Sequence, residues 1–232
     1  AHIRELYEGI ALFCRPLRCK ILGGNITSSD AGLHITTTAL GFAHKPKLRS
    51  HAKIGERIYM TGTLGGARAG LELIYNKTAD TEISELERKL LTIRHRRPRT
   101  RIEAGELARK FLIGGMIDIS DGLIADLQHI LTESNLGAKI FLNRVPLFPG
   151  TEKIAHAKGE HPAIFAATSG EEFELLFTAT PDVAIDFAKA LDLGLDVPIV
   201  EIGEMIEEKR LLVFLNDKLI SLENLSGWEH KM

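Results

Sequence analysis

Apolar residues recur every three or four positions in several stretches of the chain, and this spacing predicts amphipathic helices. In the first stretch, Ile3, Leu6 and Ile10 share the spacing, and Pro16 ends the helix. A later stretch, 123–131, places its apolar side chains on one helical face. The segments predicted to be helical are 3–15, the second half of 57–75, 82–93, 101–112, 121–134 and 181–191.

Runs rich in β-branched residues, and apolar runs bounded by turn residues, predict strands between these helices. Two short strands, 210–216 and 218–222, are expected to pair as a hairpin through Asn216 and Asp217. The other predicted strands are 20–24, 32–43, the start of 57–75, 114–120, 138–142 and 197–206, and the apolar segments 163–170 and 172–180 flank a Ser-Gly turn.

The order of these elements favours an α+β fold. Helices and strands alternate over most of the chain, but several strands follow one another after residue 197, which a purely doubly wound sheet would not show. Residues 44–56 are polar and basic, so we place a domain boundary in this stretch. We assign residues 1–47 to a first domain and residues 48–232 to a second.

The composition is that of an ordinary globular protein. Among the 232 residues, 44% are hydrophobic and 26% are charged, and the net charge is −2. This balance argues against a nucleic-acid-binding or membrane-surface protein. No apolar run approaches the roughly 20 residues that a membrane-spanning helix needs. No signal peptide opens the sequence. We therefore expect neither nucleic acid nor membrane as a partner.

The only two cysteines, Cys14 and Cys19, lie close together in the sequence. Because no second pair and no matching histidines accompany them, their spacing does not indicate a metal site. We expect free thiols in a reducing compartment.

Two clusters of like charges are expected to be solvated. The basic stretch 93–101 follows a predicted helix; an exposed loop is favoured, and a loop that faces an anion is the alternative. Glu171 and Glu172 occupy a tight turn between apolar runs. That pair binds a cationic substrate group or is solvated, and taken alone it is expected to be solvated.

Asp118 and Asp121 stand where a predicted strand gives way to a predicted helix. Ser120 or Asp121 occupies the position expected of the helix N-cap. One cap satisfies the helix, and an unpaired Asp118 at the end of an apolar strand is costly. A Mg²⁺ ion held by one or two carboxylates and by substrate phosphates explains both residues. From these residues alone, the capping and metal interpretations stay equally open.

A turn at Gly23-Gly24 is a second place where a phosphate group fits. Glycine lets the backbone approach a phosphate closely. Asn25 follows directly, and residues 27–30 add hydroxyl and carboxyl groups. An ordinary turn explains the same residues.

Six short motifs follow one another along the chain in an order that resembles one family. They are "GGNI" at residue 23, an arginine (Arg49) before "AKIGE", "MTGTLG" at residue 60, "IDISDGL" at residue 117, "SGEEFEL" at residue 169 and "GWEHKM" at the end. The sequence is therefore identified as a member of the thiamine-monophosphate kinases. These belong to the aminoimidazole ribonucleotide synthetase-like superfamily, with a two-domain α+β fold.

The resemblance implies that ATP phosphorylates thiamine monophosphate to thiamine diphosphate with the help of Mg²⁺, in a cytoplasmic homodimer. The roles that it implies are metal binding by Asp118, Asp121 and Asn25, ATP binding by Tyr7, Gly24, Asn25, Arg49 and Ser120, and substrate binding by Glu171 and Trp228. A tryptophan face and a glutamate suit the flat, cationic thiamine. An arginine suits phosphate oxygens.

Two departures from the family pattern weaken this expectation. Asn25 stands where the family has aspartate, which keeps an oxygen ligand but removes a charge. Family members carry about 70 further residues before the part that matches, within the usual size of a domain. Either these residues exist and precede this sequence, or the chain is a truncation. If they are truly missing, residues 1–47 form a remnant of the ATP-binding and dimerisation domain, and weak or absent kinase activity is expected.

Two alternatives to an active kinase remain. The first is a non-catalytic paralogue that binds a nucleotide or thiamine. The second is a relative for another ATP-dependent step, such as hydrogenase maturation or selenophosphate synthesis, against which "SGEEFEL" and "GWEH" argue.

Overall fold

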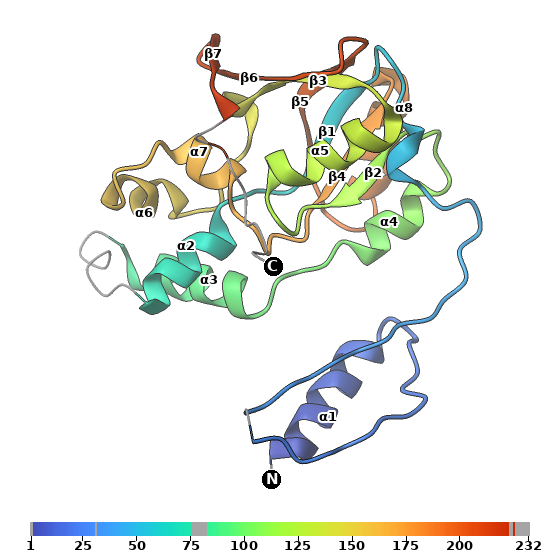
Figure 1. Cartoon of the computed structure of the whole chain (residues 1–232), viewed down its shortest axis with the longest axis vertical. Helices are drawn as coiled ribbons and strands as arrows, with labels where there is room; N and C mark the ends of the chain where they lie inside the picture. Colours follow the sequence, from blue (N-terminus) through green and yellow to red (C-terminus); the bar gives the residue numbers. More distant parts are fainter. Residues whose placement is uncertain (1, 31, 76–82, 223–224, 226–232) are drawn as a thin grey trace. The chain divides into compact units, whose positions relative to one another are not determined.

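The computed structural model describes residues 2–30, 32–75, 83–222 and 225 (Figure 1). By the density of its internal contacts, the chain divides after Phe42 into two units. The sequence placed the boundary after residue 47, and the assignment of functional domains to the two parts stays a prediction.

The first unit, Ala1–Phe42, contains helix α1 (His2–Cys14), which confirms the predicted first helix. The strands predicted at 20–24 and 32–43 are wrong, because the described residues there form no strand and their side chains are exposed. β-branched residues favour an extended backbone, but a strand also needs a neighbour that completes the ladder of hydrogen bonds. The described part of this unit supplies no such neighbour.

The second unit, Ala43–Met232, is a seven-stranded sheet with helices packed around it. Its helices and strands are η1 (Arg49–His51), β1 (Arg57–Thr61), α2 (Gly66–Tyr75), α3 (Glu85–Arg96), α4 (Ile102–Ala108), β2 (Met116–Asp118), α5 (Leu123–Ser134), β3 (Gly137–Phe141), η3 (Leu142–Arg144), α6 (Thr151–Ala157), α7 (Pro162–Ala167), β4 (Leu175–Ala179), α8 (Pro181–Asp192), β5 (Ile199–Ile206), β6 (Leu211–Leu215) and β7 (Lys218–Ile220). These elements confirm the α+β class.

The strands lie in the order β2-β4-β1-β5-β3-β6-β7. Neighbours run antiparallel except β3 and β6, which are parallel. The predicted hairpin of β6 and β7 is confirmed. Its turn residues Asn216 and Asp217 have φ values of 49° and 61°, as a tight two-residue hairpin turn requires.

Both faces of the sheet are covered, because the side chains of β1 alternate between two hydrophobic clusters. Ile58 and Met60 are buried in the cluster that includes the apolar face of α5. Tyr59 is buried in the other, with Ala108 of α4 and Phe187 of α8. The predicted apolar face of α5 is thus confirmed as part of the core.

A third cluster joins α2, α3, α6 and α7, which Figure 1 shows on one side of this unit. Leu91 of α3 and Phe165 of α7 are buried in it. A side chain at Gly70 would collide with the backbone carbonyl of Leu91, so glycine lets α2 and α3 approach closely. The apolar segment predicted after residue 163 is thus the helix α7 that helps to close this cluster.

Candidate functional site

Two turns that are far apart in the sequence lie side by side at the end of β2. Residues 118–122 make the first turn and residues 169–174 the second, and together we call them the turn junction. The N–H of Ile119 donates a 2.7 Å hydrogen bond to the carbonyl of Glu174. The N–H of Phe173 donates a 2.8 Å bond back to the carbonyl of Ile119. These bonds extend the β2–β4 pairing into the turns, so the predicted metal and substrate motifs form one unit.

The second turn packs tightly against the first. The N–H of Glu171 donates a 2.7 Å hydrogen bond to the carbonyl of Ser120. A Cβ atom at Gly170 would lie 2.8 Å from the same carbonyl oxygen, closer than real side chains come. Glu171 has a φ of 60°, in the left-handed region, and its side chain is exposed. The junction thus presents the Glu171 carboxylate outward from a fixed backbone.

The first turn is held by Asp126, which the sequence analysis missed. One oxygen of its buried carboxylate, Oδ2, accepts hydrogen bonds of 2.9, 3.0 and 3.1 Å from the N–H groups of Ser120, Asp121 and Gly122. These donors lie in the turn that leads into α5 and at its N-cap residue, Gly122. The sequence did contain a signal for this role. Asp126 lies between two apolar residues, one turn after the start of the predicted helix, where a buried carboxylate needs hydrogen-bond partners.

The prediction that Ser120 or Asp121 caps α5 is therefore wrong. The N-cap residue is Gly122, with φ of 120° and ψ of 150°, and no side chain caps the helix from that position. Burial raises the pKa of Asp126, and the hydrogen bonds from the backbone act in the opposite direction. Asp126 thus fixes the turn that leads into α5, and neither Asp118 nor Asp121 caps the helix.

Asp118 and Asp121 lie on the accessible side of the junction. Asp118 is exposed and Asp121 is partly exposed. The expected cost of burying Asp118 does not arise, because it ends an edge strand of the sheet. Among the described residues, neither carboxylate has a side-chain hydrogen bond or ion pair. Both are therefore available to a ligand.

These two carboxylates fit a Mg²⁺ ion that keeps other ligands. Magnesium in proteins is often bound by one or two carboxylates together with waters and substrate phosphates. In the described ranges, no group of three or more His, Cys, Asp or Glu side chains is placed to hold a metal. A complete protein cage is thus absent from the described residues, whereas a site shared with phosphate groups is compatible with them.

The expectation that Glu171 and Glu172 are both solvated is wrong for Glu172. Its side chain is fully buried. It accepts hydrogen bonds from Ser169 Oγ (2.7 Å), from the N–H of Ala67 (3.0 Å) and from the guanidinium of Arg94 (3.1 Å). Burial raises the pKa of Glu172, and the charge of Arg94 opposes the rise. Of the pair, only Glu171 faces solvent.

The basic stretch 93–101 is also less solvated than expected. Arg94 is buried and bonds to both Glu172 and Glu174, the latter at 3.0 Å. The guanidinium of Arg101 donates two hydrogen bonds, of 2.6 and 2.8 Å, to the two carboxylate oxygens of Glu174. This arginine–glutamate network ties α3 to the start of β4. The sequence signal was the alternation of Glu172 and Glu174 with apolar residues in the segment 172–180. This alternation indicates buried carboxylates that need a cationic partner.

The side chain of Arg49 lies away from the aspartates. It stands in η1 and pairs with Glu133 at 3.4 Å, and both side chains are about half exposed. Glu133 is near the end of α5, whereas Asp121 precedes its start. Twelve helical residues span about 18 Å, so the structure does not bring Arg49 to the turn junction.

Within the first unit, two predicted ATP contacts lie together. A Cβ atom at Gly24 would lie 2.5 Å from the hydroxyl oxygen of Tyr7, so the absence of a side chain lets the "GGNI" turn approach α1. Asn25, the next residue, is exposed. The predicted substrate contact Trp228 lies outside the described residues.

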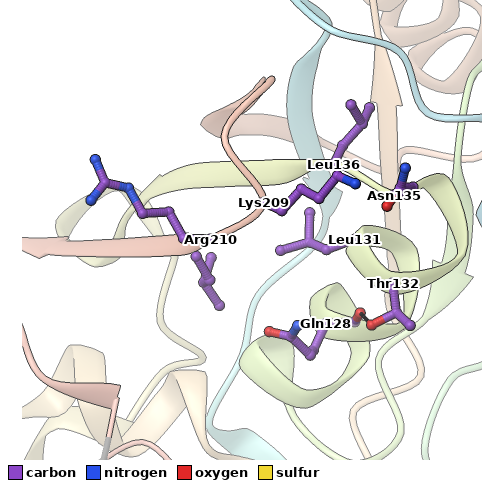
Figure 2. Close-up of a pocket in the computed structure, with 8 residues that line it drawn as sticks. Gln128, Leu131, Thr132, Asn135, Leu136, Lys209 and Arg210 are labelled. Carbon is purple, nitrogen blue, oxygen red and sulfur yellow. Dashed lines mark hydrogen bonds between the residues drawn. The ribbon is translucent and has the colours of Figure 1, made fainter.

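Two cavities lie elsewhere in the second unit. One, of about 230 Å³, lies between the end of α5 and the β5–β6 turn and is shown in Figure 2, where Gln128, Thr132 and Lys209 are among its lining residues. The other, of about 700 Å³, is lined by residues of η3, α6 and α7. Neither contains a residue predicted for the site. Across the described residues, no helix has the length and apolar character needed to cross a membrane.

Residues 53–216 match the model of the AIR synthase related protein, C-terminal domain. The chain is 30% identical over 230 residues to thiamine-monophosphate kinase of Aquifex aeolicus, covering 99% of this chain and 69% of that protein. It is 35% identical over 217 residues to the same enzyme of Escherichia coli strain K12, of which it covers 63%. The chain belongs to the thiamine-monophosphate kinase family.

Solved structures of this thiamine-monophosphate kinase family share the fold. The crystal structure of the Aquifex aeolicus enzyme matches with a TM-score of 0.74 and 27% identity, over 94% of this chain and 68% of that one. A structure of AaThiL complexed with AMPPCP and TMP matches with a TM-score of 0.75 and 26% identity, over 99% and 68%. HypE of E. coli, a hydrogenase maturation protein, matches at 16% identity and shows the fold alone.

Proposed function

We propose that this chain catalyses the transfer of a phosphoryl group from ATP to thiamine monophosphate, giving thiamine diphosphate. The turn junction carries this proposal. It holds two carboxylates, Asp118 and Asp121, on a fixed backbone with no partner of their own among the described residues. A third carboxylate, Glu171, comes from the adjoining turn. Phosphoryl transfer depends mainly on positioning and charge neutralisation, which such an arrangement supplies.

Asp118 and Asp121 are the residues that would hold Mg²⁺. When bound, the ion neutralises negative charge on the phosphate groups of the nucleotide. By holding such an ion, the two carboxylates would orient those phosphates beside the start of α5. Asp126 fixes the backbone of residues 120–122, so the direction of Asp121 is held by the protein. The hydroxyl of Ser120, between them, would contact ATP.

Arg49 would contact ATP phosphate oxygens with its planar guanidinium, which requires its side chain to leave Glu133 and turn towards the junction. Its present partner, Glu133, is about half exposed and 3.4 Å away. Exposed ion pairs contribute little stability, so exchange of this carboxylate for a phosphate is energetically easy.

In the first unit, Tyr7, Gly24 and Asn25 are proposed ATP contacts, with Asn25 also a metal ligand. Gly24 and the following residue leave backbone groups accessible to a nucleotide. For the substrate, the exposed Glu171 would face the positive charge of thiamine. Trp228 would lie against its ring.

We further propose a cytoplasmic homodimer as the working form. A single peak of twice the chain mass in light scattering supports it, and a monomer that turns over at the same rate contradicts it.

A second candidate, a binding protein without kinase activity, is favoured by one observation. Asn25 is an exposed amide where a charged carboxylate would bind a divalent ion more strongly. Asn25→Asp is the direct comparison. If this change raises thiamine diphosphate formation, Asn25 limits an existing kinase. If the chain binds Mg²⁺ and ATP but forms no product with either residue, it is a binding protein.

The decisive assay combines the chain with ATP, Mg²⁺ and thiamine monophosphate, and measures thiamine diphosphate by chromatography. Asp118→Asn and Asp121→Asn are each expected to reduce turnover by about 100-fold, the scale of losing one electrostatic stabiliser. Asp192→Asn, on exposed α8 surface, is the matched control and should keep full turnover. Calorimetry with Mg²⁺ and ATP gives an independent reading. Binding unchanged by the double variant Asp118→Asn/Asp121→Asn would contradict the proposed site.

A further inference from the structure

The end of α1 brings the two cysteines of the chain together. The N–H of Cys19 donates a 3.1 Å hydrogen bond to the carbonyl of Cys14, and the N–H of Arg18 donates a 3.1 Å bond to the carbonyl of Arg15. Arg18 has a φ of 53°, in the left-handed region. These two nested bonds around a left-handed residue are the Schellman arrangement that ends many helices.

This arrangement determines which side chains meet. It places the third residue from the helix end against the residue after the left-handed one, where an apolar contact is usual. Here the two positions are occupied by Cys14 and Cys19. The same cap brings the two cysteine side chains together at the end of the helix, with Cys14 partly exposed and Cys19 exposed. The backbone geometry therefore holds the two cysteines next to each other.

We propose that Cys14 and Cys19 are a reversible modification site that forms an intramolecular disulfide by exchange with a low-molecular-weight disulfide. The thiolate of the more accessible Cys19 attacks one sulfur of the small disulfide, forms a mixed disulfide and releases one small thiolate. The thiolate of Cys14 then attacks the Cys19 sulfur and releases the second. Two protein thiols are oxidised, one small disulfide is reduced to two thiols, and the two protons end on those thiols.

The order of these steps follows from the surroundings of each sulfur. Burial raises the pKa of Cys14, and the Cys19 thiol raises it further, so less of Cys14 is thiolate. A slower nucleophile is sufficient in the second step, because the helix cap holds its target next to it.

The resulting disulfide is suited to regulation more than to stabilisation. It would close a very short loop around Pro16, and short loops gain less stability from a cross-link than long ones. Exposed disulfides are also among the readily reduced ones. The bond would fix the segment that leads from α1 towards Gly24. The inference rests on no part of the proposed kinase activity.

The test uses the full chain and oxidised glutathione. Because the sequence has only two cysteines, a thiol titration reads the pair alone. We expect both thiols to be lost, an intact mass lower by two hydrogen atoms, and unchanged mobility on a non-reducing gel. After trypsin, peptide 5–18 should remain joined to 19–20 until dithiothreitol is added.

Single serine variants separate this site from ordinary thiols. Cys14→Ser and Cys19→Ser each leave one sulfur, so each should accumulate one glutathione adduct, faster at Cys19 than at Cys14. The proposal is overturned if the parent chain accumulates two adducts or mainly forms disulfide-linked dimers. It is also overturned if the parent keeps both thiols under conditions where Cys14→Ser reacts.

Discussion

The N–H of Glu171 donates a 2.7 Å hydrogen bond to the carbonyl of Ser120, so one backbone contact joins the proposed substrate turn to the proposed metal turn. A change on either turn is therefore expected to disturb the other.

Gly170→Ala tests this coupling. The added Cβ would lie 2.8 Å from the Ser120 carbonyl oxygen, so the turns must separate. We expect unfolding in denaturant to require about 1–3 kcal/mol less free energy, as for other overpacked sites. Turnover of thiamine monophosphate should fall as well. Gly105→Ala is the matched control. It meets open space in α4, and alanine there should add up to about 1 kcal/mol. Equal effects of the two changes would show that the turns are not coupled.

Asp126→Ala tests the support of the first turn. The change leaves three backbone N–H groups, one buried and two partly buried, without their carboxylate, and we expect a loss of about 3 kcal/mol in unfolding free energy. Asp126→Asn keeps one acceptor oxygen and should lose about 1 kcal/mol. Kinase activity should follow the same order, because the backbone of Asp121 is no longer fixed. An alanine variant as stable as the parent would contradict this role.

Asp126 also predicts a dependence on pH. Burial holds its folded pKa above the ordinary value of 3.8, so the folded state favours the protonated acid. The contribution of this group to stability is then present below pH 3.8 and declines as the pH rises through the folded pKa. Asp126→Asn should lack that decline, which urea unfolding at several pH values measures.

Sequence patterns correctly predicted the elements that depend mainly on their own residues. The apolar face of α5 and the turn residues Asn216 and Asp217 are local features, and the structure confirms both. Strands 20–24 and 32–43 were predicted from composition alone. A strand depends on a partner that no local pattern specifies, and none lies in the described part of that unit.

The sequence predicted which exposed carboxylates belong to the candidate site. It did not predict the buried residues that hold their turns in place. Asp118, Asp121 and Glu171 were identified from short motifs, and the structure brings their turns together. Glu172 and Arg94 were expected to be solvated, because a charge run normally faces water. Their burial depends on the packing of α3 against the second turn. This packing brings together Arg94 and Glu172, which are 78 positions apart in the sequence.

Glu87 gives a second pH prediction at the start of α3. Hydrogen bonds from Lys153 first, and then from Ser84, lower its pKa from 4.5 to about 2. Because the folded pKa lies below the unfolded one, this stabilisation is complete above pH 4.5 and is lost as the pH falls towards 2. Glu87→Gln should show a smaller loss of stability between pH 5 and about 2 than the parent. Glu103→Gln, on an exposed first turn of α4, is the control. Parallel curves for parent and Glu87→Gln would contradict the assignment.

The arginine–glutamate network predicts the largest change in stability. Arg94→Met removes the cation shared by Glu172 and Glu174, and both carboxylates are buried. Breaking a buried ion pair from one side costs about 3–5 kcal/mol, because a charge is left uncompensated. Arg97→Met, at an exposed position next to α3, should change stability by less than about 0.5 kcal/mol.

A double variant distinguishes lost pairing from lost packing. If Arg94 acts through charge, Glu172→Gln should recover part of the stability lost in Arg94→Met, because the uncompensated carboxylate is gone. If Arg94 acts only as a large side chain, the two losses should add. Thermal unfolding of the parent, both single variants and the double variant measures this coupling. Simple additivity would show that the buried charges of α3 and the second turn do not depend on each other.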